Sequence, residues 1–211
     1  MAGTRIGIIG AGNMGRAFAA RLAAAGHDVT ITARDPAHAE QAAAAAGGKA
    51  RAVRSNEIAR DADVLILAVP YGAAVDALRT AGDLRGRTVI DISNPLKPDM
   101  SGLSVGYTTS AAEEIQKAVP GARVVKAFNT IFAQVLGAKP GATKAQVLYA
   151  GDDAGAKDAA RALIESAGFE AVDAGPLANA RHLEPLGMLN IYFGYVAGRG
   201  TGAAPAWIGV A

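Results

Sequence analysis

The stretch that decides the fold is "IGIIGAGNMGRAFAA", residues 6–20, where an aliphatic run meets three regularly spaced glycines and an alanine-rich amphipathic segment. Gly10, Gly12 and Gly15 form the pattern G-x-G-x-x-G, which we expect between a strand and a helix. The first glycine permits a tight turn, the second lets a pyrophosphate approach the main chain, and the third lets helix and strand pack closely. The motif predicts dinucleotide binding, and the alternative is a glycine turn kept only for packing.

Aliphatic runs recur along the chain and mostly lack polar alternation, as is typical of strands buried on both faces. They cover residues 5–9, 28–33, 63–69, 88–92, 122–127, 145–150 and 170–173. Segments of helical character lie between them, at residues 14–25, 37–46, 72–81, 111–119 and 156–167. This alternation predicts an α/β fold with a doubly wound parallel Rossmann sheet.

The pattern changes at residue 177 to one longer helical stretch and a glycine-rich tail. We therefore expect a nucleotide-binding domain over residues 1–176 and a small C-terminal helical cap over residues 177–211. Turn residues agree with the element boundaries. Asp35-Pro36 is typical of a helix start, and Gly26, Gly47 and Gly168 are placed to end helices.

Composition limits the classes of function. The 211 residues are 51% hydrophobic and 19% charged, as in soluble globular proteins. The net charge is only +2, no block of like charges occurs and aromatic residues are scarce, so we expect no nucleic-acid partner. The chain has no cysteine, which excludes disulfides and thiolate metal sites, and we expect no metal. No apolar tract is long enough to span a bilayer, so we expect a cytoplasmic protein with no membrane partner.

The end of the second predicted strand indicates which dinucleotide binds. An NAD site usually has an acidic residue there to hold the ribose 2′-hydroxyl, whereas Thr32 and Ala33 are uncharged. Arg34 follows and suits a 2′-phosphate, with Thr32 and His38 assisting, so we expect NADP(H) rather than NAD. Asp35 reads better as a helix cap than as a ribose ligand. The alternative for Arg34 is a solvated surface residue.

The loops after the later strands are the next candidates, because ligands of such sheets lie beyond the carboxyl ends of the strands. These loops are "VPYG", "SNPLKP" and "FNTIF". We expect the asparagines to contact the nicotinamide or its ribose, unless they serve only as turn or cap residues. The candidate cofactor-binding residues of these loops are Val69, Pro70, Tyr71, Ser93, Asn94, Pro95, Asn129 and Thr130.

Groups for acid–base or nucleophilic chemistry are not evident. The sequence shows no Tyr-x-x-x-Lys pair, no Ser-His-Asp set and no paired-carboxylate signature, and His182 fits a surface role better than a catalytic one. We assign no catalytic residue. This pattern suits hydride transfer between two cofactors, where positioning and electrostatics do most of the work.

The chain resembles the coenzyme F420-dependent NADP reductase family, whose members move hydride between a reduced deazaflavin and NADP. The matching stretches run in order through nearly the whole chain: "IGIIGAGNMGRAFAARLAAAGHDVTITAR", "LAVPY", "DISNPL", "SAAEEIQKAVPGARVVKAFNTIFA", "GDD" and "DAGPLANARHLEPLGMLNI". A similar domain also forms the cytoplasmic part of membrane metalloreductases.

The resemblance implies a role for particular residues. It places Gly10, Ala11, Gly12, Asn13 and Met14 at the pyrophosphate, and it places Thr32, Ala33 and Arg34 at the 2′-phosphate. It puts the deazaflavin over the nicotinamide, against a wall for which the candidates are Phe128, Ile131, Met188 and Trp207. The sequence departs from the archaeal pattern in two places: Ala33-Arg34-Asp35 stands where archaeal members have a serine and two arginines, and Asn129 stands where they have a histidine.

Three hypotheses for function follow. The first is hydride transfer between NADP(H) and coenzyme F420. The second is an NADPH-dependent reductase of another acceptor, such as a free flavin, ferric chelate, imine or enone. The third is a non-catalytic NADP(H)-sensing module. The large aromatic residues Tyr192, Phe193, Tyr195 and Trp207 near the end of the chain fit either a homodimer interface or a cofactor wall.

Overall fold

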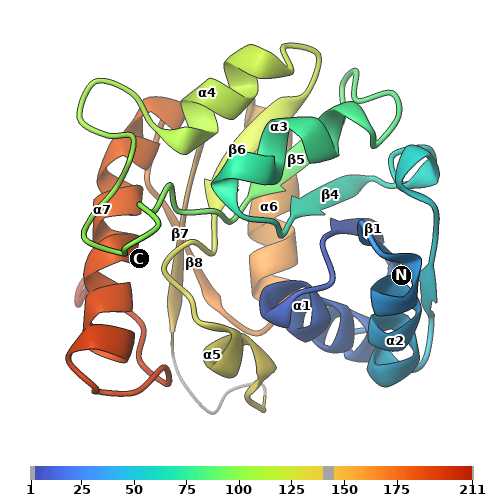
Figure 1. Ribbon diagram of the computed structural model, residues 1–211, viewed down its shortest axis with the longest axis horizontal. Helices are drawn as coiled ribbons and strands as arrows, with labels where there is room; N and C mark the ends of the chain where they lie inside the picture. The colour runs from blue at the N-terminus through green and yellow to red at the C-terminus, as the bar shows by residue number, and fades with distance from the viewer. Residues whose placement is uncertain (1–2, 140–144, 211) are drawn as a thin grey trace.

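The computed structural model describes residues 3–139 and 145–210, which form an eight-stranded sheet with helices on both faces (Figure 1). The strands are β1 (Arg5–Ile9), β2 (Asp28–Thr32), β3 (Ala50–Ala52), β4 (Val64–Leu67), β5 (Thr88–Asp91), β6 (Arg123–Ala127), β7 (Gln146–Gly151) and β8 (Glu170–Asp173). The helices are α1 (Asn13–Ala24), α2 (Pro36–Ala46), α3 (Tyr71–Arg79), α4 (Ala111–Ala118), α5 (Ala133–Gly137), α6 (Ala154–Ser166) and α7 (Ala180–Ile191). Three short helical turns complete the list: Ser55–Glu57, Leu177–Asn179 and a π-helical turn at Tyr192–Val196.

The strand order is β3-β2-β1-β4-β5-β6-β7-β8, and β1 to β6 run parallel. The direction of winding reverses between β1 and β4, which is the topological switch point of a doubly wound sheet. The expected α/β fold is therefore confirmed. The carboxyl ends of β1, β4, β5 and β6 all meet at one edge of the sheet.

One part of the expected sheet is wrong, because the last two strands are not parallel to the rest. β7 pairs antiparallel with β6, and β8 runs parallel to β7. A parallel β6–β7 pair would need a crossover connection that carries the chain from the carboxyl-terminal end of the sheet back to its amino-terminal end. The segment after β6 instead holds the short helix α5, which packs against α1. β7 then enters the sheet at the same end at which β6 finishes.

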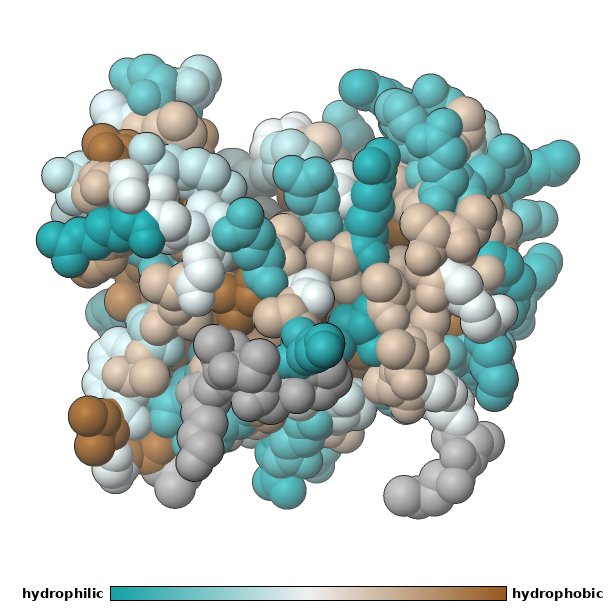
Figure 2. Space-filling model, turned by 90° about the horizontal axis from the view of Figure 1, so that it is seen from below, coloured by the Kyte–Doolittle hydropathy of each residue, from teal (hydrophilic) through white to brown (hydrophobic). Residues whose placement is uncertain are grey.

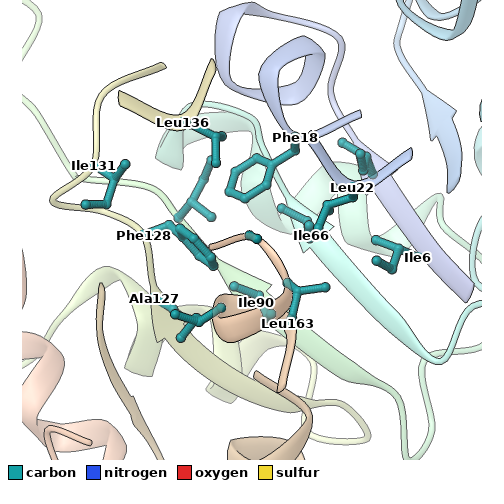
Figure 3. Packing of buried hydrophobic residues seen from close by; sticks show 14 of the residues in the cluster. Ile6, Phe18, Leu22, Ile66, Ile90, Ala127, Phe128, Ile131, Leu136 and Leu163 are labelled. Carbon is teal, nitrogen blue, oxygen red and sulfur yellow. The ribbon is translucent and has the colours of Figure 1, made fainter. Parts of the chain in front are cut away.

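Side chains of the central strands are buried on both faces, as their uninterrupted apolar runs predict, whereas the outer strands β3 and β8 are partly exposed. Ile8, Ile66 and Ile90 face the layer of α1, α2, α5 and α6, whereas Leu65 and Val89 face the layer of α3 and α4. Figure 3 shows the first of these clusters, with side chains from the sheet meeting those of α1 and α6. This burial on both faces holds the strands in place, and with them the carboxyl-terminal end of the sheet where the loops lie together.

Helix ends also follow the sequence. The carboxylate of Asp35 accepts the N–H of Ala37 at 3.0 Å, so Asp35 caps α2 rather than facing a ligand. β3 and α5 were missed. The three residues of β3, Ala-Arg-Ala, carry no aliphatic run, and α5 is too short to show helical periodicity.

The segment after residue 176 begins with a short turn that packs on β7, and α7 follows against α4. Its division from residues 1–176 as a separate cap stays a prediction. Large hydrophobic side chains are exposed near its end. Figure 2, seen from below, shows scattered hydrophobic patches among hydrophilic surface on the left of the molecule. The exposed hydrophobic residues of this C-terminal segment include Leu189, Tyr192, Tyr195, Val196 and Ile208.

Within residues 3–139 and 145–210, no helix has both the length and the apolar character needed to cross a membrane.

Candidate functional site

A cleft of about 370 Å³ lies at the carboxyl edge of the sheet, beside the switch point between β1 and β4. It extends from the glycine turn, past the loops after β4, β5 and β6, to one side of α7. Its lining residues are Gly12, Asn13, Met14, Ala68, Val69, Pro70, Ile92, Ser93, Asn94, Phe128, Asn129, Thr130, Ile131, Phe132, Ala133, Gly187, Asn190, Ile191 and Tyr195. The structure thus brings together most of the candidate residues that the sequence had placed after different strands.

The glycine turn has the geometry of a pyrophosphate site. Gly10 has a φ of +115°, and a Cβ there would lie 2.3 Å from the carbonyl oxygen of Ala68. A Cβ on Gly15 would lie 1.9 Å from the carbonyl oxygen of Gly10, so no side chain fits at either position. A Cβ on Gly12 would meet no protein atom within 4 Å. Gly12 therefore leaves open space in front of the amino end of α1, which has no side-chain cap.

The corner expected to hold the 2′-phosphate lies at the end of β2, and the structure places its residues only partly as expected. Arg34 is exposed, in keeping with contact to a phosphate. Thr32 is only 2% exposed, and its hydroxyl lies 3.0 Å from the Ser55 hydroxyl, so this hydroxyl is not presented at the surface. The half-buried Ala33 packs against the core, and His38 is exposed on α2. The loop after β3 thus supports this corner, and no residue pattern had indicated that contact.

Two asparagines meet at the far end of the cleft. The Asn129 amide donates to Asn94 Oδ1 at 2.9 Å, and the Asn94 amide donates to the Asn129 carbonyl at 2.8 Å. Among the residues that the structure describes, no protein group bonds Asn129 Oδ1 or the Ser93 hydroxyl, although both atoms are buried. Buried polar atoms are normally paired. These two are available to a ligand that carries N–H or O–H groups.

α7 forms the opposite wall through residues that sequence reasoning did not single out. A Cβ on Gly187 would lie 2.6 Å from Asn94 Oδ1, so only glycine lets the helix approach the asparagine pair. The Leu183 carbonyl accepts from the Asn129 amide at 2.8 Å, and the Asn190 amide donates to the Thr130 carbonyl at 3.0 Å. Gly187 and Asn190 fall inside the "GMLNI" stretch that resembles the family, but no spacing rule marks them.

Phe128, expected in the acceptor wall, belongs to the floor of the cleft. Its φ of +59° is unusual for a bulky residue, and it turns the chain where β6 ends. The ring is 1% exposed and packs edge-to-face with Phe18 at 5.0 Å and Phe169 at 6.1 Å. Figure 3 shows Phe128 beside Phe18 in the core. The neighbouring Ile131 is also buried and lines the cleft.

Other candidates do not line this cleft. Met188 is half-buried on α7, and Trp207 lines a separate, mostly apolar hollow of about 520 Å³ beside Leu148 and His182. The main chain of Trp207 is held by both amide atoms of Gln146, at 2.5 and 3.0 Å. The structure therefore does not bring either residue to the expected acceptor wall.

Tyr71 and Pro95 lie next to lining residues rather than among them. Burial, and to a lesser degree the carboxylates of Glu114 and Glu184, raises the pKa of Tyr71 above its usual value. Tyr71 is therefore a neutral phenol at physiological pH. It begins α3, and it packs against the core on the face of the sheet that α3 and α4 cover.

Comparison with known proteins places this site in a family. The profile of "NADP oxidoreductase coenzyme F420-dependent" matches residues 5–95. An F420-dependent NADP reductase of Methanothermobacter marburgensis is 34% identical over 195 residues, which cover 84% of this chain and 86% of that protein. The chain belongs to the F420-dependent NADP reductase family. The resemblance seen in the motifs is thereby confirmed.

Two further matches frame this member of the family. A crystal structure from Arthrobacter sp. FB24, described provisionally as an F420-dependent NADP reductase, superposes with a TM-score of 0.84 at 29% identity, covering 97% of this chain and 100% of that one. Metalloreductase STEAP3 of Rattus norvegicus is 32% identical over 182 residues. That match covers 86% of this chain but only 36% of the metalloreductase.

Proposed function

We propose that this protein transfers hydride between NADP(H) and a planar acceptor held in the same cleft, and that the acceptor is the deazaflavin coenzyme F420. Membership of the family supports the use of NADP(H) and F420. The observation that carries the proposal is the continuous cleft from Gly12 to Gly187, with buried, unpaired polar atoms on Ser93 and Asn129 at one end.

The residues present fit a dinucleotide of this kind. Gly12 and the free N–H groups at the start of α1 bind the pyrophosphate, together with Ala11, Asn13 and Met14. Arg34 binds the 2′-phosphate. Asn129 Oδ1 accepts a hydrogen bond from the carboxamide end of the nucleotide. The other lining residues proposed for the nucleotide side of the cleft are Val69, Pro70, Ser93, Asn94 and Thr130, and Gly10 and Gly15 shape the turn.

The acceptor lies against the apolar side of the cleft. Ile131, Phe132 and Ile191 line it there, and Tyr195 packs edge-to-face on Phe132 at 5.6 Å. Nicotinamide, when bound, supplies or receives the hydride. The protein binds and aligns the two planar reactants and excludes water between them, which requires no general acid or base.

The decisive test is direct. The protein is titrated with NADPH and with NADH, and each reduced nucleotide is then mixed with oxidised deazaflavin while the absorbance of both is followed. We expect tighter binding of NADPH and hydride transfer to the deazaflavin. Folded protein that binds NADPH but leaves deazaflavin oxidised would refute F420 as the acceptor.

A second candidate acceptor is a ferric chelate or a free flavin, and the match to a metalloreductase favours it. The same NADPH-loaded protein is assayed with these acceptors in parallel, with imines and enones included in the panel. Turnover that is faster with one of them than with deazaflavin would select this second function. Nucleotide binding without turnover on any acceptor would instead select a sensing module.

Homodimer formation and a cytoplasmic location stay predictions. Exposed aromatic residues near the end of the chain, Tyr192, Phe193 and Tyr195, support a dimer interface on that surface. Sedimentation of the purified protein across a range of concentrations measures its oligomeric state. A monomer at every concentration would contradict the dimer.

A further inference from the structure

Three fully buried charged side chains lie just beneath the nicotinamide end of the cleft. Lys126 on β6 and Asp91 on β5 are both 0% exposed, and Glu184 on α7 is 1% exposed. The ammonium of Lys126 lies 2.6 Å from Asp91 Oδ2 and 2.8 Å from Glu184 Oε1. This buried triad joins two central strands to the C-terminal helix.

The triad holds one cleft residue by both of its backbone polar groups. Asp91 Oδ1 accepts the N–H of Ser93 at 2.9 Å, and Lys126 donates to the carbonyl of Ser93 at 2.7 Å. Ser93 lines the cleft, as does the next residue, Asn94. The position of this loop therefore depends on where the triad lies.

Glu184 fastens the opposite wall. Its carboxylate accepts the N–H groups of Ala111 and Ala112 at 3.0 and 3.3 Å, where α4 begins. The partial positive charge of that helix end offsets the second carboxylate of the triad. One turn further along α7, Gly187 touches the asparagine pair of the cleft. The triad thus ties both walls of the cleft to one another.

Burying three charges is costly, and well-packed hydrophobic residues often give a fold equal stability. A geometric role explains the triad better than a stabilising one. We propose that Lys126, Asp91 and Glu184 are positioning residues that set the spacing between the loop after β5 and α7, and hence the alignment of the hydride acceptor with the nicotinamide.

This inference rests on the proposed function, and it adds that hydride transfer and nucleotide affinity respond differently when the triad is changed. The triad contacts the Ser93 loop, α4 and α7, whereas the glycine turn and Arg34 bind the rest of the nucleotide. Disturbing the triad should therefore impair hydride transfer and acceptor use while leaving nucleotide affinity nearly unchanged. A merely structural role would weaken both together.

The test uses Glu184→Gln in the full chain. The amide has nearly the shape of the carboxylate, but its NH₂ group must face either Lys126 or the N–H groups of α4, so one of these contacts is lost. The matched control is Glu113→Gln. Glu113 pairs with Arg181 at 2.6 Å and links the same two helices through partly exposed side chains, and its side-chain hydrogen bonds within the described residues go to Arg181 and Ser110 rather than to the cleft loop.

We expect Glu184→Gln to lower kcat/KM for deazaflavin by about tenfold or more, with the Kd for NADPH within about twofold of the original protein. Amide hydrogen exchange at Ser93 and Asn94 should become faster. The control should leave all three quantities within about twofold. Glu184→Asp keeps the charge but shortens its reach, and it should give the same selective loss in smaller measure, which matters if the amide variant folds poorly.

Two results would overturn the proposal: Glu184→Gln and Glu113→Gln behaving alike, or affinity for NADPH falling as much as kcat/KM. Absence of turnover in the unaltered protein would instead refute the deazaflavin acceptor. In that case two measurements that need no acceptor test the positioning claim: amide hydrogen exchange at Ser93, and the fluorescence emission of bound NADPH, which reports the surroundings of the nicotinamide. Unchanged exchange and emission in Glu184→Gln would refute it.

Discussion

At the glycine turn, the binding surface comes from residues adjacent in the sequence, whereas at the α7 end it comes from segments far apart in the chain. Gly10, Gly12 and Gly15 act through their missing side chains and leave open space before the uncapped amino end of α1, the proposed site for phosphate. The other end depends on long-range contacts, such as Asn94 with Asn129 and Asp91 with Lys126, 35 residues apart in each case.

The difference teaches that the two ends tolerate change in different ways. At the glycine turn, each position has its own steric limit, so binding and stability can be separated by choosing the position. At the α7 end, buried charges join several elements, so each substitution acts on more than one element at once. Substitutions at the two ends therefore test the comparison directly.

Gly15→Ala should have the largest effect. The new Cβ would lie 1.9 Å from a backbone oxygen that cannot move aside, and we expect a loss of about 4 kcal/mol or more in unfolding free energy. Gly12→Ala is the matched control, since its Cβ meets no protein atom. It should cost less than about 1 kcal/mol of stability and still weaken NADPH binding by about tenfold or more. Urea unfolding and NADPH titration measure both. Normal NADPH binding by Gly12→Ala would leave the glycine turn a packing feature only.

Lys126→Met comes next and tests the other end. It leaves the carboxylates of Asp91 and Glu184 buried without a cation, and we expect a loss of about 3–5 kcal/mol in unfolding free energy. Adding Glu184→Gln to this variant removes one uncompensated charge and should recover part of the loss. Unfolding in urea measures the four combinations. An additive double variant would show that the two side chains do not interact.

What the sequence predicted follows the same division. The glycine motif, the buried strands and the Asp35-Pro36 cap depend on local spacing, and the structure confirms them. The direction of β7, the contact of Gly187 with the asparagines, and the triad depend on how distant segments pack. Lys126 and Asp91 lie inside aliphatic strands, and a charged residue within such a strand was the signal in the sequence that could have indicated a buried charge network. Trp207 is the opposite case: we expected it in the acceptor wall because it is aromatic, but it lines a separate hollow.

Arg34→Ala sharpens the comparison at the level of ligand choice. We propose that the exposed guanidinium binds the 2′-phosphate, so its loss should weaken NADPH binding by about 1–3 kcal/mol and leave NADH binding nearly unchanged. Arg85→Ala is the control for the change in net charge, since Arg85 is exposed and paired with Asp83 at 2.7 Å. Isothermal titration with both nucleotides measures the difference. An equal loss for NADPH and NADH would place Arg34 elsewhere than at the 2′-phosphate.

Glu113→Gln should have the smallest effect, because its ion pair with Arg181 joins α4 and α7 near the surface rather than in the core. Hydrogen bonds from Arg181 lower the pKa of Glu113 below its usual 4.5. A lowered pKa in the folded state stabilises the fold above the unfolded pKa, and this stabilisation is lost as pH falls through the folded value. The unaltered protein should therefore be slightly more stable than Glu113→Gln at neutral pH, and the gap should close under acid conditions. Urea unfolding at pH 7 and at about pH 3 measures the gap. A gap that persists in acid would mean that Glu113 acts through its shape, which would make this surface pair more like the buried triad than the comparison allows.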